Sequence, residues 1–277
     1  MNSVEEHFTG QDGIDIRWKA WLPDTEPRAV LVVAHGFGEH IDRYGNLVNA
    51  AVPRGFAVYG LDHRGHGRSG GVRAYIDKHD YLLDDLDQLF GRVAASYPGV
   101  PVFLIGHSMG GNIALASALR NPGRLRGLVL SGPAVTTYGV PKGLMILARV
   151  LARIAPKFGV RKLSSAGVSR DPAVVAAYDA DPLVFHGKMP AGTGWAILRT
   201  SKEFPARLPQ LTLPLLVVHG SADALVSVES GKTAHGLAGS VDKTLKIYDG
   251  LFHEVFNEPE HETVLADVLN WVEAHLQ

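Results

Sequence analysis

A serine flanked by glycines is the residue of this chain with the best setting for covalent chemistry. Ser108 is the centre of Gly106-His107-Ser108-Met109-Gly110, which matches the pattern G-x-S-x-G. An apolar run precedes this segment and a helical pattern follows it, so the serine is expected on a tight turn between a strand and a helix. The first N–H groups of that helix would point to the place where negative charge develops. We therefore predict that Ser108 is a nucleophile.

An aspartate and a histidine downstream have the positions expected of partners for Ser108. Asp223 and His253 each lie just after an apolar, strand-like run. The order serine, acid, histidine is the one found in α/β-hydrolases. His253 is expected to accept the serine proton and return it to the leaving alcohol, while Asp223 orients the imidazole. Asp249 is the alternative acid, but its place four residues before His253 favours a role in the turn.

Other histidines of the chain compete with His253, since there are 13 in all. His219 ends a strand-like run and is interpreted as structural. Four more lie in glycine-rich loops and are interpreted as shaping those loops by hydrogen bonding, namely His35, His63, His66 and His107.

Two backbone N–H groups are predicted to form an oxyanion hole. The loop His35-Gly36-Phe37-Gly38 follows an apolar run, and a loop at this place supplies one donor in α/β-hydrolases. The residue after the nucleophile supplies the other. We assign these donors to Phe37 and Met109. Loss of one such donor typically lowers the rate by roughly 10²–10³.

The residues singled out need a sheet that brings them to one edge. Alternating strand-like and helical patterns predict an α/β fold, the α/β-hydrolase fold, with a mostly parallel central sheet flanked by helices. The alternating segment 14–21 suits an antiparallel hairpin at the sheet edge. The expected buried strands are 29–34, 56–61, 102–105, 128–130, 215–219 and 244–248, and the expected helices are 81–97, 109–120 and 263–276.

One long segment interrupts this alternation. From Gly132 to about Phe204 no strong strand candidate occurs, and the segment looks helical and loop-like. An insertion here is expected to cover the carboxyl edge of the sheet, where ligands bind in open α/β folds. We therefore predict a catalytic core of residues 1–131 and 205–277 and a mainly helical cap of residues 132–204.

The composition is typical of a globular enzyme. The 277 residues are 46% hydrophobic and 20% charged, and the net charge of −1 gives no reason to expect a nucleic-acid partner. The chain has no cysteine, and no His and carboxylate cluster has metal-ligand spacing, so neither a metal nor another cofactor is expected. No signal peptide and no run of 18 apolar residues is visible, which favours a cytoplasmic protein. The sequence is compatible with a homo-oligomer.

Several motifs together resemble the monoacylglycerol lipase family, most of all its mycobacterial-type members. The resemblance covers nearly the whole chain, although the cap lacks the cysteines of the mammalian members. The motifs are HGFGEH at 35–40 with Arg43-Tyr44, DHRGHGRS at 62–69, GHSMGG at 106–111, AYDADPL at 177–183, HGSAD at 219–223 and KIYDGLFHE at 246–254.

The resemblance implies hydrolysis of monoacylglycerols to a fatty acid and glycerol. It also implies that Glu39 and Arg43 lie near the polar end of the pocket, and that His107 and Tyr178 help to hold the glycerol group. For Glu39 and Arg43 a loop ion pair, and for Tyr178 packing within the cap, remain the alternatives. Two other functions stay open: a lysophospholipase or general carboxylesterase with the same triad, and a catalytically idle α/β-hydrolase that acts as a ligand receptor.

The first part of the cap has the features of a membrane-surface helix. Residues 132–170 contain seven Lys or Arg residues and no Asp or Glu. Within 144–154, Leu144, Leu147, Leu151 and Ile154 share one helical face with Val150 beside them, and Arg149 and Arg153 share another. Such a helix can lie in a membrane interface. We therefore expect peripheral membrane contact, although packing of the apolar face on the core is the alternative.

Overall fold

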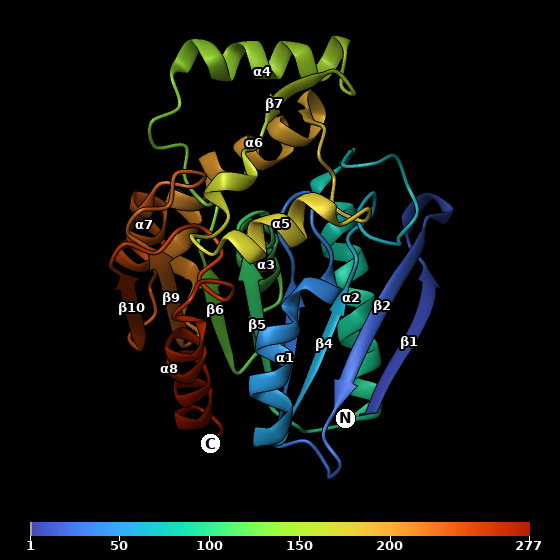
Figure 1. Ribbon diagram of the computed structural model, residues 1–277, viewed down its shortest axis with the longest axis vertical. Coiled ribbons are helices and arrows are strands. Elements are labelled where there is room, and N and C mark those ends of the chain that lie inside the picture. The colour runs from blue at the N-terminus through green and yellow to red at the C-terminus, as the bar shows by residue number, and fades with distance from the viewer. Residues whose placement is uncertain (1) are drawn as a thin grey trace.

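The centre of the molecule is an eight-stranded sheet between two layers of helices, seen in a computed structural model that describes residues 2–277 (Figure 1). The strand order is β1-β2-β4-β3-β5-β6-β9-β10. Neighbours from β4 to β10 are parallel, whereas β1 with β2 and β2 with β4 are antiparallel. The strands are β1 (Asn2–Thr9), β2 (Asp15–Leu22), β3 (Ala29–Ala34), β4 (Phe56–Leu61), β5 (Val102–His107), β6 (Gly127–Ser131), β9 (Leu215–Gly220) and β10 (Lys243–Tyr248).

Alternate side chains of the central strands enter two separate cores. Val30 and Val32 of β3 belong to the core that α2 and α3 cover, whereas Leu31 and Val33 belong to the core that α1 and α8 cover. Because both faces are buried, these strands are continuous apolar runs in the sequence. The helices of this part are α1 (Gly45–Ala51), α2 (His79–Ser96), α3 (Met109–Arg120), α7 (Val228–Leu237) and α8 (His261–Ala274).

The predicted α/β-hydrolase fold is confirmed, with a mostly parallel sheet flanked by helices. The ends of the predicted strands and helices differ from the observed ones by at most two residues. The hairpin of β1 and β2 also occupies the sheet edge, as the alternating pattern of 14–21 indicates. No helix within residues 2–277 is long and apolar enough to cross a membrane.

The segment between β6 and β9 lies over the carboxyl edge of the sheet (Figure 1). Besides helices it contains an antiparallel pair of strands that the sequence analysis did not predict, since strands of three and four residues are too short for a recognisable pattern. The division at 131/132 and 204/205 stays a prediction; helix α6 runs through residue 204. The elements are α4 (Lys142–Ile154), β7 (Gly159–Lys162), α5 (Pro172–Ala180), β8 (Lys188–Pro190) and α6 (Ala191–Arg207).

Candidate active site

Ser108 occupies a strained turn between β5 and α3. Its φ of 55° and ψ of −116° lie in a region that side chains rarely adopt. Glycine is required nearby because a Cβ on Gly110 would lie 1.9 Å from the carbonyl oxygen of Ala34, and a Cβ on Gly106 would lie 2.5 Å from that of Gly110. The turn therefore packs directly against β3 and leaves Ser108 half-exposed at the edge of the sheet.

Asp223 and His253 meet beside this turn. Nδ1 of His253 lies 2.6 Å from Oδ2 of Asp223, and the Asp223 side chain is fully buried. The backbone N–H groups of Leu225 and Val226 donate to Oδ1 at 2.8 and 2.9 Å. Burial alone would raise the pKa of Asp223, but hydrogen bonds from His219 and His253 outweigh burial and hold that pKa well below its usual range. An ionised Asp223 leaves Nε2 of His253 as the basic nitrogen.

Ser108 and His253 line one small cavity together with Gly36 and Phe37 of the loop after β3. This loop is close to the serine, because a Cβ on Gly36 would lie 3.3 Å from Cβ of Ser108. Within residues 2–277 the N–H groups of Phe37 and Met109 donate no hydrogen bond. Two free donors beside a serine and an imidazole can stabilise a tetrahedral oxyanion. Asp249, the alternative acid, is exposed and accepts a hydrogen bond from Ser221 instead.

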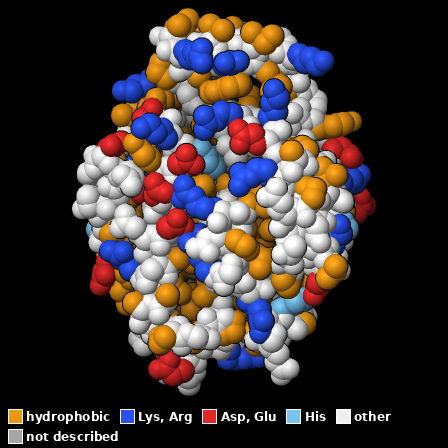
Figure 2. Space-filling model, turned by 180° about the vertical axis from the view of Figure 1, so that it is seen from behind, with side chains coloured by type: hydrophobic (Ala, Val, Ile, Leu, Met, Phe, Trp, Pro, Cys, Tyr) orange, Lys and Arg blue, Asp and Glu red, His pale blue; other side chains and the backbone are white. Residues whose placement is uncertain are grey.

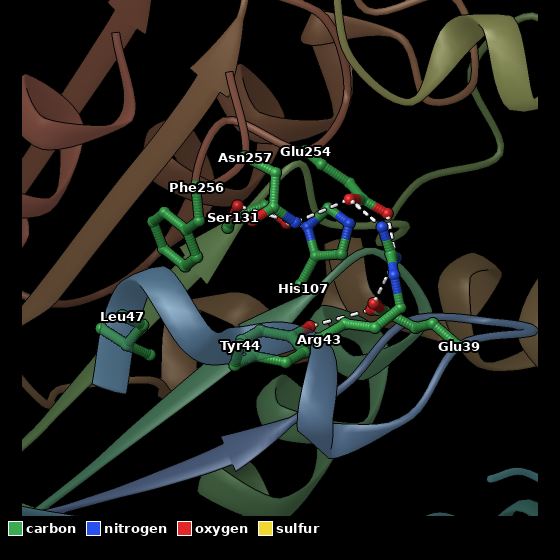
Figure 3. Close-up of a pocket in the computed structure, with 9 residues that line it drawn as sticks. All are labelled: Glu39, Arg43, Tyr44, Leu47, His107, Ser131, Glu254, Phe256 and Asn257. Atoms are coloured by element: carbon green, nitrogen blue, oxygen red, sulfur yellow. Dashed lines mark hydrogen bonds and ion pairs between the residues drawn. The ribbon is translucent and has the colours of Figure 1, made fainter. Parts of the chain in front are cut away.

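Glu39 and Arg43 form a buried ion-pair network next to the cavity (Figure 3). Arg43 donates to Glu39 at 2.9 Å and binds both carboxylate oxygens of Glu254 at 2.5 and 2.7 Å. Glu39 also accepts from the N–H of Gly36 at 2.5 Å and from the Tyr44 hydroxyl at 2.9 Å. Both oxygens of Glu39 are thus occupied in shaping the loop that carries Phe37.

Glu254 is the charged residue of this network to which the sequence analysis gave no role. It is buried, and burial would raise its pKa, but the Arg43 guanidinium lowers it and keeps the carboxyl ionised. Its place directly after His253 was the only available signal, because the partner Arg43 lies 211 positions away in the chain.

His107 and Tyr178 line the cavity with groups that have no partner. The ring of His107 lies 4.6 Å from that of His253, and its Nδ1 lies 3.1 Å from the carbonyl oxygen of Ser131. Burial, together with the nearby His253, lowers the pKa of His107 to about 4. Tyr178 projects from α5, with its ring 4.6 Å from the Arg43 guanidinium. Within residues 2–277, Nε2 of His107 and the Tyr178 hydroxyl make no hydrogen bond, so both are available to a ligand.

Comparisons with known proteins agree with this chemistry. Residues 25–260 match the family model described as serine aminopeptidase, S33. The chain is 46% identical to a monoacylglycerol lipase of Mycolicibacterium smegmatis over 98% of each chain, and 35% identical to human monoglyceride lipase over 96% of this chain and 89% of the relative. The chain belongs to the monoacylglycerol lipase family. As a family member it is a serine hydrolase that acts on esters.

Solved structures support the same placement in the monoacylglycerol lipase family. The crystal structure of a monoacylglycerol lipase from Paleococcus ferrophilus superimposes with a TM-score of 0.83 at 29% identity, over 92% of this chain and 98% of the other. The predicted resemblance to the family is therefore confirmed. Within residues 2–277, no group of three or more His, Asp or Glu side chains could hold a metal ion.

Proposed function

We propose that this enzyme hydrolyses monoacylglycerols to a fatty acid and glycerol, with Ser108, His253 and Asp223 as its catalytic triad. The observation that supports this most directly is the shared cavity. In it the strained serine and the imidazole bound to Asp223 lie with two unpartnered polar groups, on His107 and Tyr178. A small polyol needs hydrogen-bonding groups of this kind beside the reacting ester.

The first half of the reaction forms an acyl-enzyme. Ser108 attacks the ester carbonyl while Nε2 of His253 takes its proton, and Asp223 stabilises the imidazolium. The N–H groups of Phe37 and Met109 stabilise the oxyanion. The proton on His253 passes to the leaving glycerol oxygen. Water then repeats the sequence, again deprotonated by His253, and the fatty acid leaves.

The glycerol group is assigned to His107 and Tyr178. Because Nδ1 of His107 faces a carbonyl oxygen, it carries the proton, and Nε2 is left to accept a hydrogen bond from a glycerol hydroxyl. Burial raises the pKa of Tyr178, so its hydroxyl stays protonated. Glu39 and Arg43 act indirectly, since their polar atoms already bind each other, Gly36, Tyr44 and Glu254.

Substrate comparison tests this proposal. Rates are measured on monoacylglycerols of graded chain length, lysophosphatidylcholine and a short nitrophenyl ester, with Ser108→Ala as the control. Tyr178→Phe is expected to raise KM for monoacylglycerol about three- to tenfold, as the loss of one hydrogen bond implies, and to leave the nitrophenyl ester unaffected. Faster turnover of lysophosphatidylcholine would favour a lysophospholipase. Failure of a fluorophosphonate to label Ser108 would favour an idle receptor.

We further propose that helix α4 contacts lipid surfaces. None of its residues is buried, and Leu144, Leu147 and Ile154 are 52%, 51% and 74% exposed. Figure 2 shows hydrophobic and basic side chains together along this end of the molecule. Within residues 2–277 its cations Lys142, Arg149 and Arg153 form no ion pair with a carboxylate. An exposed apolar face with free cations suits an anionic membrane surface.

Liposome binding tests the contact. Replacing Leu144 and Leu147 with Ser is expected to weaken binding to liposomes and to leave turnover of a short soluble ester unchanged. The matched control is Val241→Ser, since Val241 is fully exposed but lies just before β10, outside the cap. Unchanged affinity in the double variant would contradict the proposal.

A further inference from the structure

His219 shares the carboxylate oxygen that holds the candidate base. It lies near the end of β9 and is fully buried. Its Nε2 is 3.0 Å from Oδ2 of Asp223 and 3.1 Å from the carbonyl oxygen of Val226. A carbonyl oxygen only accepts, so Nε2 must carry the proton. His219 therefore donates from Nε2 to Asp223.

The hydrogen bonds that Asp223 accepts occupy all of the acceptor positions on its carboxylate. Oδ1 accepts two backbone N–H groups, and Oδ2 accepts from Nδ1 of His253 at 2.6 Å and from Nε2 of His219. A carboxylate has about four lone-pair positions, so none remains for water. Without His219, one position on Oδ2 would be empty, and it would be on the oxygen that orients His253.

The other ring nitrogen of His219 is in an unfavourable environment. Its buried Nδ1 has no hydrogen-bond partner within residues 2–277. Gly231 of α7 packs against it so closely that a Cβ there would lie 2.7 Å from Nδ1. An unpaired buried nitrogen is unfavourable, and a purely structural position in this apolar setting would be better filled by an aliphatic side chain.

We propose that His219 is a positioning residue that holds Oδ2 of Asp223 toward His253 and shares its negative charge with that imidazole. The proposal rests on the proposed triad. Two donors on one oxygen compete for its charge, so Asp223 stabilises a protonated His253 less than it would alone. His219 would thereby keep His253 free to act as a base at lower pH. It would also prevent Asp223 from rotating away.

Few other charges face the pair formed by Asp223 and His253. His107 approaches His253 from the end of β5, and the ion pair of Glu254 with Arg43 lies beside it in the chain and in space. Glu39 and Tyr178 line the same cavity from the loop after β3 and from α5. Substitution of His219 leaves all of these groups in place. A change in the pH profile can therefore be attributed to the shared oxygen.

The test compares two replacements of His219. His219→Leu removes the donor, and His219→Gln keeps an N–H donor of similar reach. For Leu we expect kcat to fall about tenfold with little change in KM, and the acid limb of kcat/KM to move up by roughly 0.5 to 1 pH unit. For Gln we expect kcat within about threefold of the unsubstituted enzyme and an unmoved limb. Rates are expressed per site labelled by a fluorophosphonate, and His219→Met replaces Leu if that variant does not fold.

Two results would overturn the proposal. One is a Leu or Met variant with the kcat and pH profile of the unsubstituted enzyme. The other is an equal loss of kcat in the Gln and the apolar variants, with no shift of the acid limb of kcat/KM. That result would mean that His219 contributes only packing. Asp223→Ala is measured beside them. Full activity in that variant would refute the proposed triad itself, whatever His219 does.

Discussion

The cap has two unlike parts. We call residues 163–187 the anchored segment, because it binds the loops that carry the candidate active-site residues. Val168 accepts a hydrogen bond from the N–H of Glu254 at 2.8 Å, and the N–H of Phe185 donates to Gly38 at 2.7 Å. Nε2 of His40 lies 2.8 Å from Oδ2 of Asp181. The anchored segment therefore contacts both the loop that carries Phe37, the proposed oxyanion donor, and the loop that carries His253, the proposed base.

Helix α4 has a different environment. It packs mainly on α6, no residue of it is buried, and its outward side is apolar. Figure 1 shows α4 as the outermost element of the cap, separated from the sheet by α6. The comparison indicates that changes at the anchored segment should alter turnover or stability, whereas changes on α4 should alter affinity for a surface.

The largest expected effect is a loss of stability at low pH, and it arises around the loops under the anchored segment. Burial lowers the pKa of His35 and of His107 to about 4 and that of His66 to about 3, and all three lie around the loops that the anchored segment covers. Between pH 6.5 and 4 the unfolded chain binds protons that the folded chain excludes. Unfolding is therefore favoured as the pH falls, by roughly 3 kcal/mol for each imidazole.

Urea unfolding from pH 8 to pH 4 checks this expectation. The free energy of unfolding should be highest above pH 6.5 and should fall steeply below it. His66→Gln should flatten the slope, whereas His7→Gln, at an exposed position, should leave it unchanged. A free energy that stays constant down to pH 4 would contradict the assignment of buried neutral imidazoles.

The second effect concerns the network under the anchored segment. Arg43→Met would leave Glu39 and Glu254 as buried carboxylates without their cation, at a cost of about 3–5 kcal/mol of stability. Arg153→Met on α4 is the matched control and should change stability by less than about 0.5 kcal/mol. Chemical denaturation of both variants at neutral pH measures the difference. Equal stability would mean that the network contributes nothing to the fold.

Sequence reasoning succeeded where local pattern decides the outcome. The runs of β3 and β4 are buried on both faces, so composition alone located them, and the glycines around Ser108 indicated a turn that only small residues allow. The partner of Glu254 could not be found in this way, because Arg43 lies 211 positions away in the chain. His219 and Asp223 are only four positions apart, but they meet across a turn after β9, where no periodic pattern predicts which side chains touch. The short strands β7 and β8 carry no periodic signal either.

The third effect tests whether the anchored segment holds the loop that carries Phe37 in place. Asp181→Ala removes the contact with His40 and should loosen the loop that carries Phe37. Because misplacing one oxyanion donor affects the transition state, we expect kcat to fall about tenfold, less than the complete loss of a donor would cause. Liposome affinity should not change. Asp24→Ala, at an exposed position in the loop before β3, is the control, and equal kcat in the two variants would show that the contact is dispensable.

The smallest effect is expected at the cations of α4. Arg153→Gln should weaken binding to vesicles that contain anionic lipid about fivefold, since one basic residue near such a surface contributes about 1 kcal/mol. Binding to neutral vesicles and turnover of a short soluble ester should not change, and the difference should disappear at high salt. Arg126→Gln is the matched control. Arg126 is also exposed, but it precedes β6 at the amino end of the strand, on the side of the sheet away from the cap. If both variants weakened binding equally, the attraction would belong to the whole surface of the protein, and α4 would contribute only its apolar side chains.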